Sequence, residues 1–235
     1  MEIDDQIKFY DERWGKKSYL NSLKLRRATK IMDYFTVVKR KLKLPRTIDL
    51  GCGDGRFIAF IGEFTPAEGI ELSEEAVRLA NEKYPNTKFF QGNVLEFPFE
   101  KEAYDLVISQ EVIEHIEEQP KYVAVAANVL KKGGYLILTT PNKKVFDHME
   151  GGNWSNQPIE KVLTPKELKK LVAQKFDIIR YESIIMNFGN LGYFKFINHR
   201  YVIGGCKRLG LEKFREWILS ALGFGLHQCV LAKKK

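Results

Sequence analysis

The chain has 235 residues with 44% hydrophobic and 12% aromatic content, which suits one globular domain with a full core and excludes a disordered chain. Its start, MEIDDQ, lacks the basic and apolar regions of a signal peptide, and no apolar run reaches the length of a membrane span, so we expect a cytoplasmic protein. Cys52, Cys206 and Cys229 have neither C-x-x-C pairing nor zinc-ligand spacing and are predicted to be reduced thiols.

The net charge of +8 is concentrated at the two ends of the chain. Residues 1–45 carry 12 basic and 6 acidic side chains, and residues 187–235 carry 9 basic and 2 acidic ones, whereas the centre is mildly acidic. A solvated surface accounts for such an asymmetry, and an anionic substrate or an anionic surface as partner accounts for it as well.

Apolar periodicity predicts that helices and strands alternate along the chain. Residues 18–43 carry apolar side chains at helical spacing among many basic ones, which predicts an amphipathic helix that ends before Pro45. Strands are predicted at 47–50, 67–72, 88–92, 104–109, 134–142, 176–186 and 226–234. Helices are predicted between them, at 55–64, at 74–84 after the N-cap Ser73, and at 121–130, stopped by Gly133 and Gly134. The alternation predicts an α/β fold with a doubly wound, mostly parallel seven-stranded sheet.

Three glycines follow the first predicted strand, in IDLGCGDGRF at 48–57. In such a sheet a ligand binds beyond the carboxyl ends of the strands, and glycine lets the ligand touch the main chain. A dinucleotide fingerprint would need glycine or alanine where Arg56 stands, which disfavours a nicotinamide or flavin cofactor. Glu71 ends the second predicted strand, where a carboxylate can accept hydrogen bonds from both ribose hydroxyls. The pattern favours a nucleoside-containing ligand without a pyrophosphate.

The sequence resembles the class I methyltransferases that use S-adenosylmethionine. Five motifs carry the resemblance, namely IDLGCGDG, GIELS, QGNVLEFPF, YDLVISQEVIEHI and VLKKGGYLILTTPN, and they span roughly residues 45–186. The ubiquinone-type and small-molecule O-methyltransferases are the nearest group. The resemblance implies S-adenosylmethionine as cofactor and a Rossmann-like methyltransferase fold.

The resemblance also implies which residues meet the cofactor. Asp49, Gly51 and Gly53 would shape the pocket for its methionine part, and Glu71 would bind its ribose. The pair that meets the adenine would be Asn93 and Val94, with Asn where the family more often has Asp, and Gln110 would lie near the sulfonium. The predicted cofactor-binding residues, with Cys52 and Leu72 included, are Asp49, Gly51, Cys52, Gly53, Glu71, Leu72, Asn93, Val94 and Gln110.

The run EVIEH places Glu111, Glu114 and His115 at helical spacing, so that on a helix they would share one face. That arrangement can bind a divalent cation, and similar motifs serve metal-assisted methylation in ubiquinone-type and small-RNA 3′-end methyltransferases. Those families usually add another histidine, and the corresponding run NQPIEKVLTPKEL has none, so we predict no metal site. His115 is the predicted catalytic acid or base, with helix packing as the alternative, and His199 and His227 are interpreted as structural or surface residues.

The two ends of the chain are expected to define the substrate. Tyr10 and Trp14 precede the first predicted helix, and resembling enzymes often fold such a segment over the cofactor as a lid, although packing on the core is an equal alternative. Residues 187–224 form an aromatic and basic insertion that includes the amphipathic run EKFREWILSAL. Packing on its own domain is one interpretation of this insertion. A cover over a greasy acceptor, with Tyr193, Phe194 and Phe196 as substrate contacts, or contact with a membrane surface are the others.

One domain, residues 1–235, is therefore expected, with a helical lid at 1–45, a cofactor-binding core at 46–186, the insertion at 187–224 and the last strand at 225–235. Three functions are compatible with it. The first is methyl transfer to a small-molecule, lipid or glycan-precursor acceptor at oxygen. The second is RNA methylation, suggested by the +8 charge and EVIEH, although no appended nucleic-acid-binding module is recognised. The third is nucleoside binding without catalysis, which the glycine loop, Glu71 and Gln110 disfavour.

Overall fold

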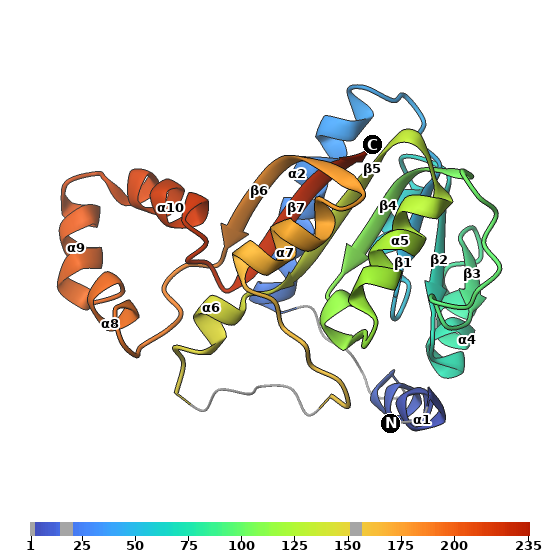
Figure 1. Ribbon diagram of the computed structural model, residues 1–235, viewed down its shortest axis with the longest axis horizontal. Coiled ribbons are helices and arrows are strands. Elements are labelled where there is room, and N and C mark those ends of the chain that lie inside the picture. Colours follow the sequence, from blue (N-terminus) through green and yellow to red (C-terminus); the bar gives the residue numbers. More distant parts are fainter. Residues whose placement is uncertain (1–2, 15–20, 151–156) are drawn as a thin grey trace.

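The computed structural model describes residues 3–14, 21–150 and 157–235, and its strands form one sheet in the order β3-β2-β1-β4-β5-β7-β6 (Figure 1). The strands are β1 (Thr47–Leu50), β2 (Ala67–Glu71), β3 (Lys88–Gln91), β4 (Tyr104–Gln110), β5 (Leu130–Pro141), β6 (Phe176–Ile184) and β7 (His227–Lys234). The first five pair in parallel, and β7 runs antiparallel between β5 and β6. The predicted doubly wound, mostly parallel sheet of seven strands is confirmed.

Ten α-helices and one short 3-10 helix fall within the described residues. They are α1 (Ile3–Trp14), α2 (Ser22–Lys39), α3 (Arg56–Gly62), α4 (Glu74–Lys83), η1 (Ile113–His115), α5 (Gln119–Val129), α6 (Lys143–Phe146), α7 (Pro165–Val172), α8 (Phe194–Ile197), α9 (Arg200–Arg208) and α10 (Glu212–Ala221). None of these helices is long and apolar enough to cross a membrane. The helix predicted at 18–43 is α2, and positions 18–20 of that prediction lie outside the described residues.

Side chains at the helix starts explain where several helices begin. Asn21 accepts a hydrogen bond from the Lys24 amide and caps α2, and Ser73 accepts one from the Ala76 amide and caps α4, as predicted. Thr164 caps α7 in a capping box with Glu167. These caps are local in sequence, so each helix start is set by residues no more than three positions away.

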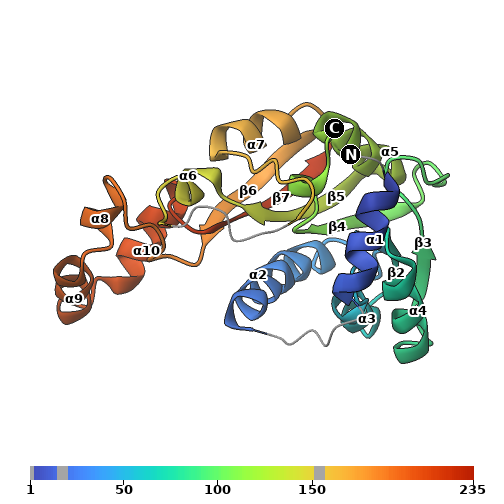
Figure 2. The same ribbon diagram turned by 90° about the horizontal axis from the view of Figure 1, so that it is seen from below.

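The sheet separates two cores, because alternate residues of each strand point to opposite faces (Figure 2). On one face, Leu136 and Leu138 of β5 pack with α5 and α7. On the other face, Tyr135 and Ile137 of the same strand pack with α2, α3 and α4. Helices on both faces leave the carboxyl ends of β1, β2 and β4 as the edge at which ligands bind in such folds.

The fifth strand corrects one prediction. The helix predicted at 121–130 ends at Val129, and β5, predicted to begin at Gly134, already begins at Leu130, which pairs with Tyr104 of β4. The register then shifts between Tyr104 and Leu106, and Gly133 takes a φ of +74°, a conformation that favours glycine. The two glycines therefore bend a strand instead of stopping a helix, because pairing with β4 outweighs the local helical pattern.

Candidate active site

One cavity of about 840 Å³ opens at the carboxyl ends of the parallel strands. This volume lies near the top of the ~300–1,000 Å³ range of ligand pockets, which leaves room for a cofactor and an acceptor together. All nine residues predicted to meet the cofactor line it: Asp49, Gly51, Cys52, Gly53, Glu71, Leu72, Asn93, Val94 and Gln110. The fold thus brings together residues from four strand ends, and their contact with a cofactor stays a prediction.

Glu71 holds the glycine loop in place. One oxygen of its buried carboxylate accepts a hydrogen bond from the Gly53 amide at 2.9 Å, and the other accepts from the amides of Leu72 at 2.9 Å and Ser73 at 3.2 Å. Burial raises the pKa of Glu71, and these three N–H groups act in the opposite direction because they favour the charged form. Glu71 therefore joins the end of β2 to the loop after β1, in addition to facing the cavity.

The glycines of the loop are required by space and by conformation. Gly51 has a φ of +88°, and a Cβ added there would lie 2.5 Å from Cγ2 of Val112. Gly53 has a φ of +55°, and a Cβ there would lie 2.6 Å from the ring of Trp14. A larger residue at either position would strain the backbone and displace a cavity wall.

Asp49 is a buried carboxylate with an unpaired oxygen. Its exposed fraction is 1%, and its Oδ1 atom has no hydrogen-bond partner among the described residues. Burial, and then the neighbouring Glu71, raise the pKa of Asp49 from 3.8 to about 8. A buried carboxyl oxygen without a partner, facing a cavity, fits a ligand that brings a hydrogen-bond donor or a positive charge that favours the ionised form.

Helix α1 forms one wall of the cavity, and it corrects the expectation that Tyr10 and Trp14 merely precede the first helix. Both lie on α1 and both line the cavity, where the Tyr10 hydroxyl donates to Gln157 Oε1 at 3.0 Å. Asp11 docks this helix on the start of α4, because its Oδ1 accepts from the Ser73 hydroxyl at 2.5 Å and from the Glu75 amide at 3.2 Å. The predicted lid at 1–45 includes residues 1–2 and 15–20, which lie outside the described part, and its opening stays a prediction.

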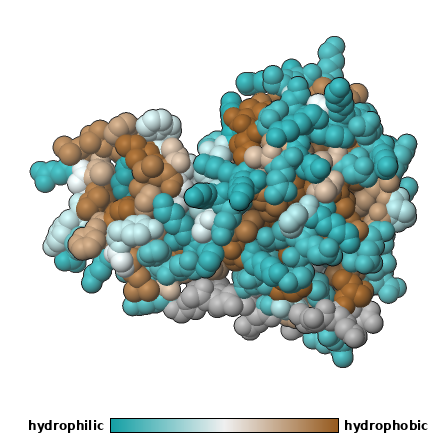
Figure 3. All heavy atoms as spheres, viewed as in Figure 1, coloured by the Kyte–Doolittle hydropathy of each residue, from teal (hydrophilic) through white to brown (hydrophobic). Residues whose placement is uncertain are grey.

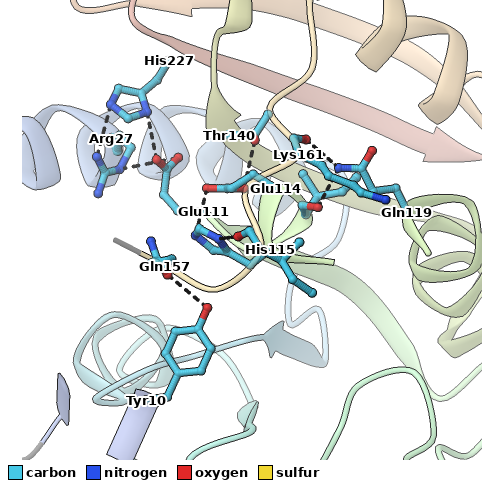
Figure 4. Close-up of polar contacts among 12 residues, drawn as sticks. Tyr10, Arg27, Glu111, Glu114, His115, Gln119, Thr140, Gln157, Lys161 and His227 are labelled. Carbon is cyan, nitrogen blue, oxygen red and sulfur yellow. Dashed lines mark hydrogen bonds and ion pairs between the residues drawn. The ribbon is translucent and has the colours of Figure 1, made fainter. Parts of the chain in front are cut away.

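The EVIEH segment is not the helix that its spacing suggested. Glu111 has a φ of +57°, which is unusual for a residue other than glycine, and only Ile113–His115 form a 3-10 turn. The reason is that Glu111 follows β4 directly and its amide donates to Thr139 O of β5 at 2.9 Å, so the chain turns sharply at the sheet edge. The side chains of Glu111, Glu114 and His115 still lie close together, because this turn, and not a helix, brings them there (Figure 4).

Glu111 is held by two cationic or proton-bearing side chains from distant elements. Its Oε2 lies 2.9 Å from His227 Nδ1, and its Oε1 lies 3.7 Å from Arg27 Nε. Burial would raise the pKa of Glu111, but His227 and Arg27 outweigh it and lower that pKa. His227, interpreted from the sequence as a structural or surface residue, is buried, because β7 places it in this cluster with Glu111.

Glu114 and His115 form a second pair beside the first. Glu114 is 2% exposed, and burial followed by the charge of Glu111 raises its pKa well above the ordinary value, so its carboxyl stays protonated. One of its oxygens accepts from the Thr140 hydroxyl at 2.9 Å, and the other lies 3.7 Å from His115 Nε2.

The protonation of His115 follows from its other contact. Nδ1 lies 2.8 Å from the carbonyl oxygen of Ile159, and a carbonyl can only accept, so Nδ1 carries the proton. Burial lowers the pKa of His115 below its ordinary 6.5, so the ring is neutral at pH 7 and Nε2 keeps its lone pair. His115 lines the cavity, so the geometry can support a base at this place.

The described residues contain no group of three or more His, Cys, Asp and Glu side chains with the arrangement of a metal site. Glu111 faces His227 and Arg27, and Glu114 holds a proton, so neither offers a free carboxylate to an ion. That the protein acts without a metal stays a prediction.

Comparison with known proteins places the chain in a family. The sequence model of the methyltransferase domain family matches residues 42–177, which is more than half of the chain. The chain belongs to this methyltransferase domain family. The matched region contains every strand end that builds the floor of the cavity.

Individual relatives of this methyltransferase domain are distant. It is 32% identical over 102 residues to a probable S-adenosylmethionine-dependent methyltransferase of Mycobacterium tuberculosis, a match that covers 42% of this chain and 36% of that protein. It is 28% identical over 115 residues to the ubiquinone/menaquinone biosynthesis C-methyltransferase of Campylobacter jejuni, covering 46% and 48%. The chain thus spans about a third to a half of the length of these curated relatives. A solved structure from Pyrococcus horikoshii shares the fold, with a TM-score of 0.61 and 18% identity over 92% of this chain and 93% of that one.

The aromatic residues predicted as acceptor contacts lie away from the cavity of this methyltransferase domain. Tyr193, Phe194 and Phe196 are not among the residues that line it. Phe194 is fully buried and packs with Val145, Ile185 and Leu226, whereas Phe196 is 75% exposed to solvent. Residues 187–224 therefore do not cover the cavity in this structure.

Three residues of the site had no recognisable signal in the sequence. Arg27 comes from α2, His227 from the first position of β7, and Gln157 from the segment that follows the undescribed residues 151–156. Each carries a common polar side chain outside any motif. Their roles depend on which strand lies beside β5 and on where α2 and α1 pack against the site, and neither composition nor spacing reveals that.

Proposed function

We propose that this methyltransferase domain binds S-adenosylmethionine and transfers its methyl group to an oxygen of a small-molecule, lipid or glycan-precursor acceptor. The observation that carries the proposal is the shared cavity, in which the glycine loop, Glu71 and the unpaired carboxylate oxygen of Asp49 face the same space as His115. Its relatives in Mycobacterium tuberculosis and Campylobacter jejuni, a probable S-adenosylmethionine-dependent methyltransferase and a C-methyltransferase, support the methyl transfer but not the choice of oxygen.

The residues present fit the cofactor. Asp49 would pair with its amino group, the glycine loop would leave room for its methionine part, and Glu71 would accept from its ribose hydroxyls with lone pairs that the backbone amides do not use. When bound, S-adenosylmethionine supplies a methyl group on a positively charged sulfur. The protein's own task is to position the acceptor and exclude water, and orientation can account for about 7–11 kcal/mol of a barrier.

His115 would take the proton of the acceptor hydroxyl on Nε2. The Ile159 carbonyl keeps the ring in the tautomer whose Nε2 is free, and burial keeps it neutral. The ionised Glu111 would stabilise the imidazolium once it forms, since its negative charge already acts to raise the pKa of His115, and Glu114, 3.7 Å from Nε2, would keep its own proton. A positioned base of this kind contributes about 10²–10⁴-fold to a rate.

The rest of the cavity wall favours an acceptor with an apolar part. Leu25, Ala28 and Met32 of α2 face it together with Pro141 and Phe146. Pockets lined in this way bind apolar groups and leave orientation to a few polar ones. RNA is the second candidate acceptor, because the chain carries a net charge of +8.

Purified protein should be titrated with S-adenosylmethionine by calorimetry and then incubated with the radiolabelled methyl donor and separate small-molecule, lipid and RNA fractions. We expect binding, and label in the small-molecule or lipid fraction with the methyl group on oxygen by NMR. Label in RNA, lost steeply as salt rises, would establish the second candidate instead. Label on carbon would refute the oxygen assignment, and failure to bind the cofactor would refute the proposal as a whole.

A further inference from the structure

Residues 187–224 form a lobe that stands beside the sheet instead of on it. In Figure 1 the helices α8, α9 and α10 project past the end of β6, away from α1 and the cofactor-binding strands. We call residues 187–224 the side lobe. It lies outside residues 42–177, the region that matches the methyltransferase domain family.

The side lobe exposes more large hydrophobic side chains than the rest of the described residues. Ten of the sixteen exposed large hydrophobic side chains among the described residues belong to it, although it is 38 residues long: Leu191, Tyr193, Phe196, Tyr201, Val202, Leu209, Leu211, Phe214, Trp217 and Leu222. Helix α9 buries no residue, and α10 buries only Leu219. Figure 3 shows hydrophobic side chains gathered over this lobe. Exposed apolar groups on this scale mark an interaction surface.

The lobe is nonetheless held in a defined shape. Arg215 of α10 donates to the side chain of Asn187 at 3.0 Å, to the carbonyl of Ile197 at 2.8 Å and to the side chain of Asn198 at 3.2 Å. Phe194 is fully buried and ties α8 to the domain core. The exposed aromatic groups are thus presented by an ordered scaffold.

Aromatic and basic side chains alternate on the exposed helices. On α10, Phe214 and Trp217 lie one turn apart with stacked rings, 6.0 Å between centroids, and Trp217 is 66% exposed. Lys207 and Arg208 end α9 and are exposed, and Lys213 stands beside Phe214. Helices with Trp and Phe beside Lys and Arg are typical of those that lie in the interface of an anionic membrane.

The net charge of the side lobe distinguishes between the partners that could cover it. It carries six basic and two acidic side chains, a net charge of +4. Contact between two copies through this face would bring like charges together, whereas an anionic lipid surface would neutralise them and accept the aromatic rings. We propose that the side lobe docks the protein on the surface of an anionic lipid bilayer, with Phe214 and Trp217 inserted at the headgroup level and Lys207 and Arg208 on the phosphates.

The test is partition onto vesicles of phosphatidylcholine alone and of phosphatidylcholine mixed with phosphatidylglycerol, measured by co-sedimentation. We expect binding to the mixed vesicles only, with a shift of tryptophan fluorescence to shorter wavelength that Trp217→Phe removes. Lys207→Gln with Arg208→Gln should lower the partition coefficient about thirtyfold, the equivalent of about 1 kcal/mol for each basic residue. Phe214→Ser with Trp217→Ser should lower it by at least about tenfold.

Matched controls lie outside the lobe. Lys166 and Lys170 are exposed on α7, and Leu44 is 68% exposed, close to the value of Trp217. Lys166→Gln with Lys170→Gln, and Leu44→Ser, should leave the partition coefficient unchanged, and all variants should keep the melting temperature. The proposal is overturned if the wild-type protein does not bind the mixed vesicles. It is also overturned if the partition coefficient falls equally in the control variants and the lobe variants. Two other results would also overturn it. One is a wild-type protein that does not bind vesicles but forms a dimer in sedimentation velocity, which the lobe variants lose. The other is a wild-type protein that does not bind vesicles but binds RNA through the same lobe residues.

Discussion

Replacing Asp49 by asparagine should make the protein more stable while weakening its ligand binding. The structure buries the carboxylate fully, and its pKa rises from 3.8 to about 8. Because the folded-state pKa lies above the unfolded one, the folded protein keeps a proton that the unfolded chain has released. The stability that this group confers is therefore complete below about pH 4 and is lost as the pH rises towards about 8.

The magnitude follows from the same two pKa values. Each pH unit between them costs about 1.4 kcal/mol of unfolding free energy, so about 4 kcal/mol has been lost at pH 7. The asparagine of the Asp49→Asn variant does not titrate. The unfolding free energy of the variant should therefore fall less steeply with pH than that of the wild-type protein, by about 1.4 kcal/mol per pH unit. Urea unfolding at several pH values between about 5 and 8 measures both slopes.

Ligand binding should change in the opposite direction. A positive group beside Asp49 favours the ionised carboxylate, so S-adenosylhomocysteine should expel about one proton when it binds at pH 7. Calorimetry in two buffers of different ionisation enthalpy counts that proton, and Asp49→Asn should release none and bind roughly 1.5–3 kcal/mol more weakly. Asp177→Asn, at an exposed carboxylate of β6, is the control. Equal slopes and equal affinities for wild type and Asp49→Asn would refute the reasoning.

Glu71→Gln replaces an oxygen that accepts backbone N–H groups by an N–H donor. The affinity for S-adenosylhomocysteine, measured by calorimetry, should therefore fall by roughly 1–3 kcal/mol. An unchanged affinity would show that this carboxylate does not shape the site. His115→Asn should keep that affinity but lower turnover about 10²–10⁴-fold. In the wild-type enzyme, turnover should fall only as the pH drops through the His115 pKa, below 6.5, and a midpoint above that value would argue against this base. EDTA should leave turnover intact, because Arg27 and His227 already hold Glu111, whereas recovery by magnesium or manganese after chelation would reveal a metal site.

Much of the fold was determined by the sequence alone, because its signals are local. The alternation along β5, which sends Leu136 to one core and Ile137 to the other, is visible as a pattern of period two. The cap at Ser73 needs only the next three residues. The place of the glycine loop and Glu71 in the site could also be predicted from the sequence. Each stands at the end of a predicted strand, and the ends of parallel strands meet at one edge of the sheet.

The tertiary structure alone decided which side chains contact one another in the site. Arg27, Glu111 and His227 meet only because β7 enters antiparallel beside β5 and because α2 crosses the same edge, and no spacing in the sequence encodes that neighbourhood. The positive φ of Glu111 replaced the expected helix, since pairing with β5 at Thr139 holds the turn. The pKa values of Asp49 and Glu114 likewise come from burial, which depends on what the whole chain packs around a carboxyl group and not on its sequence neighbours.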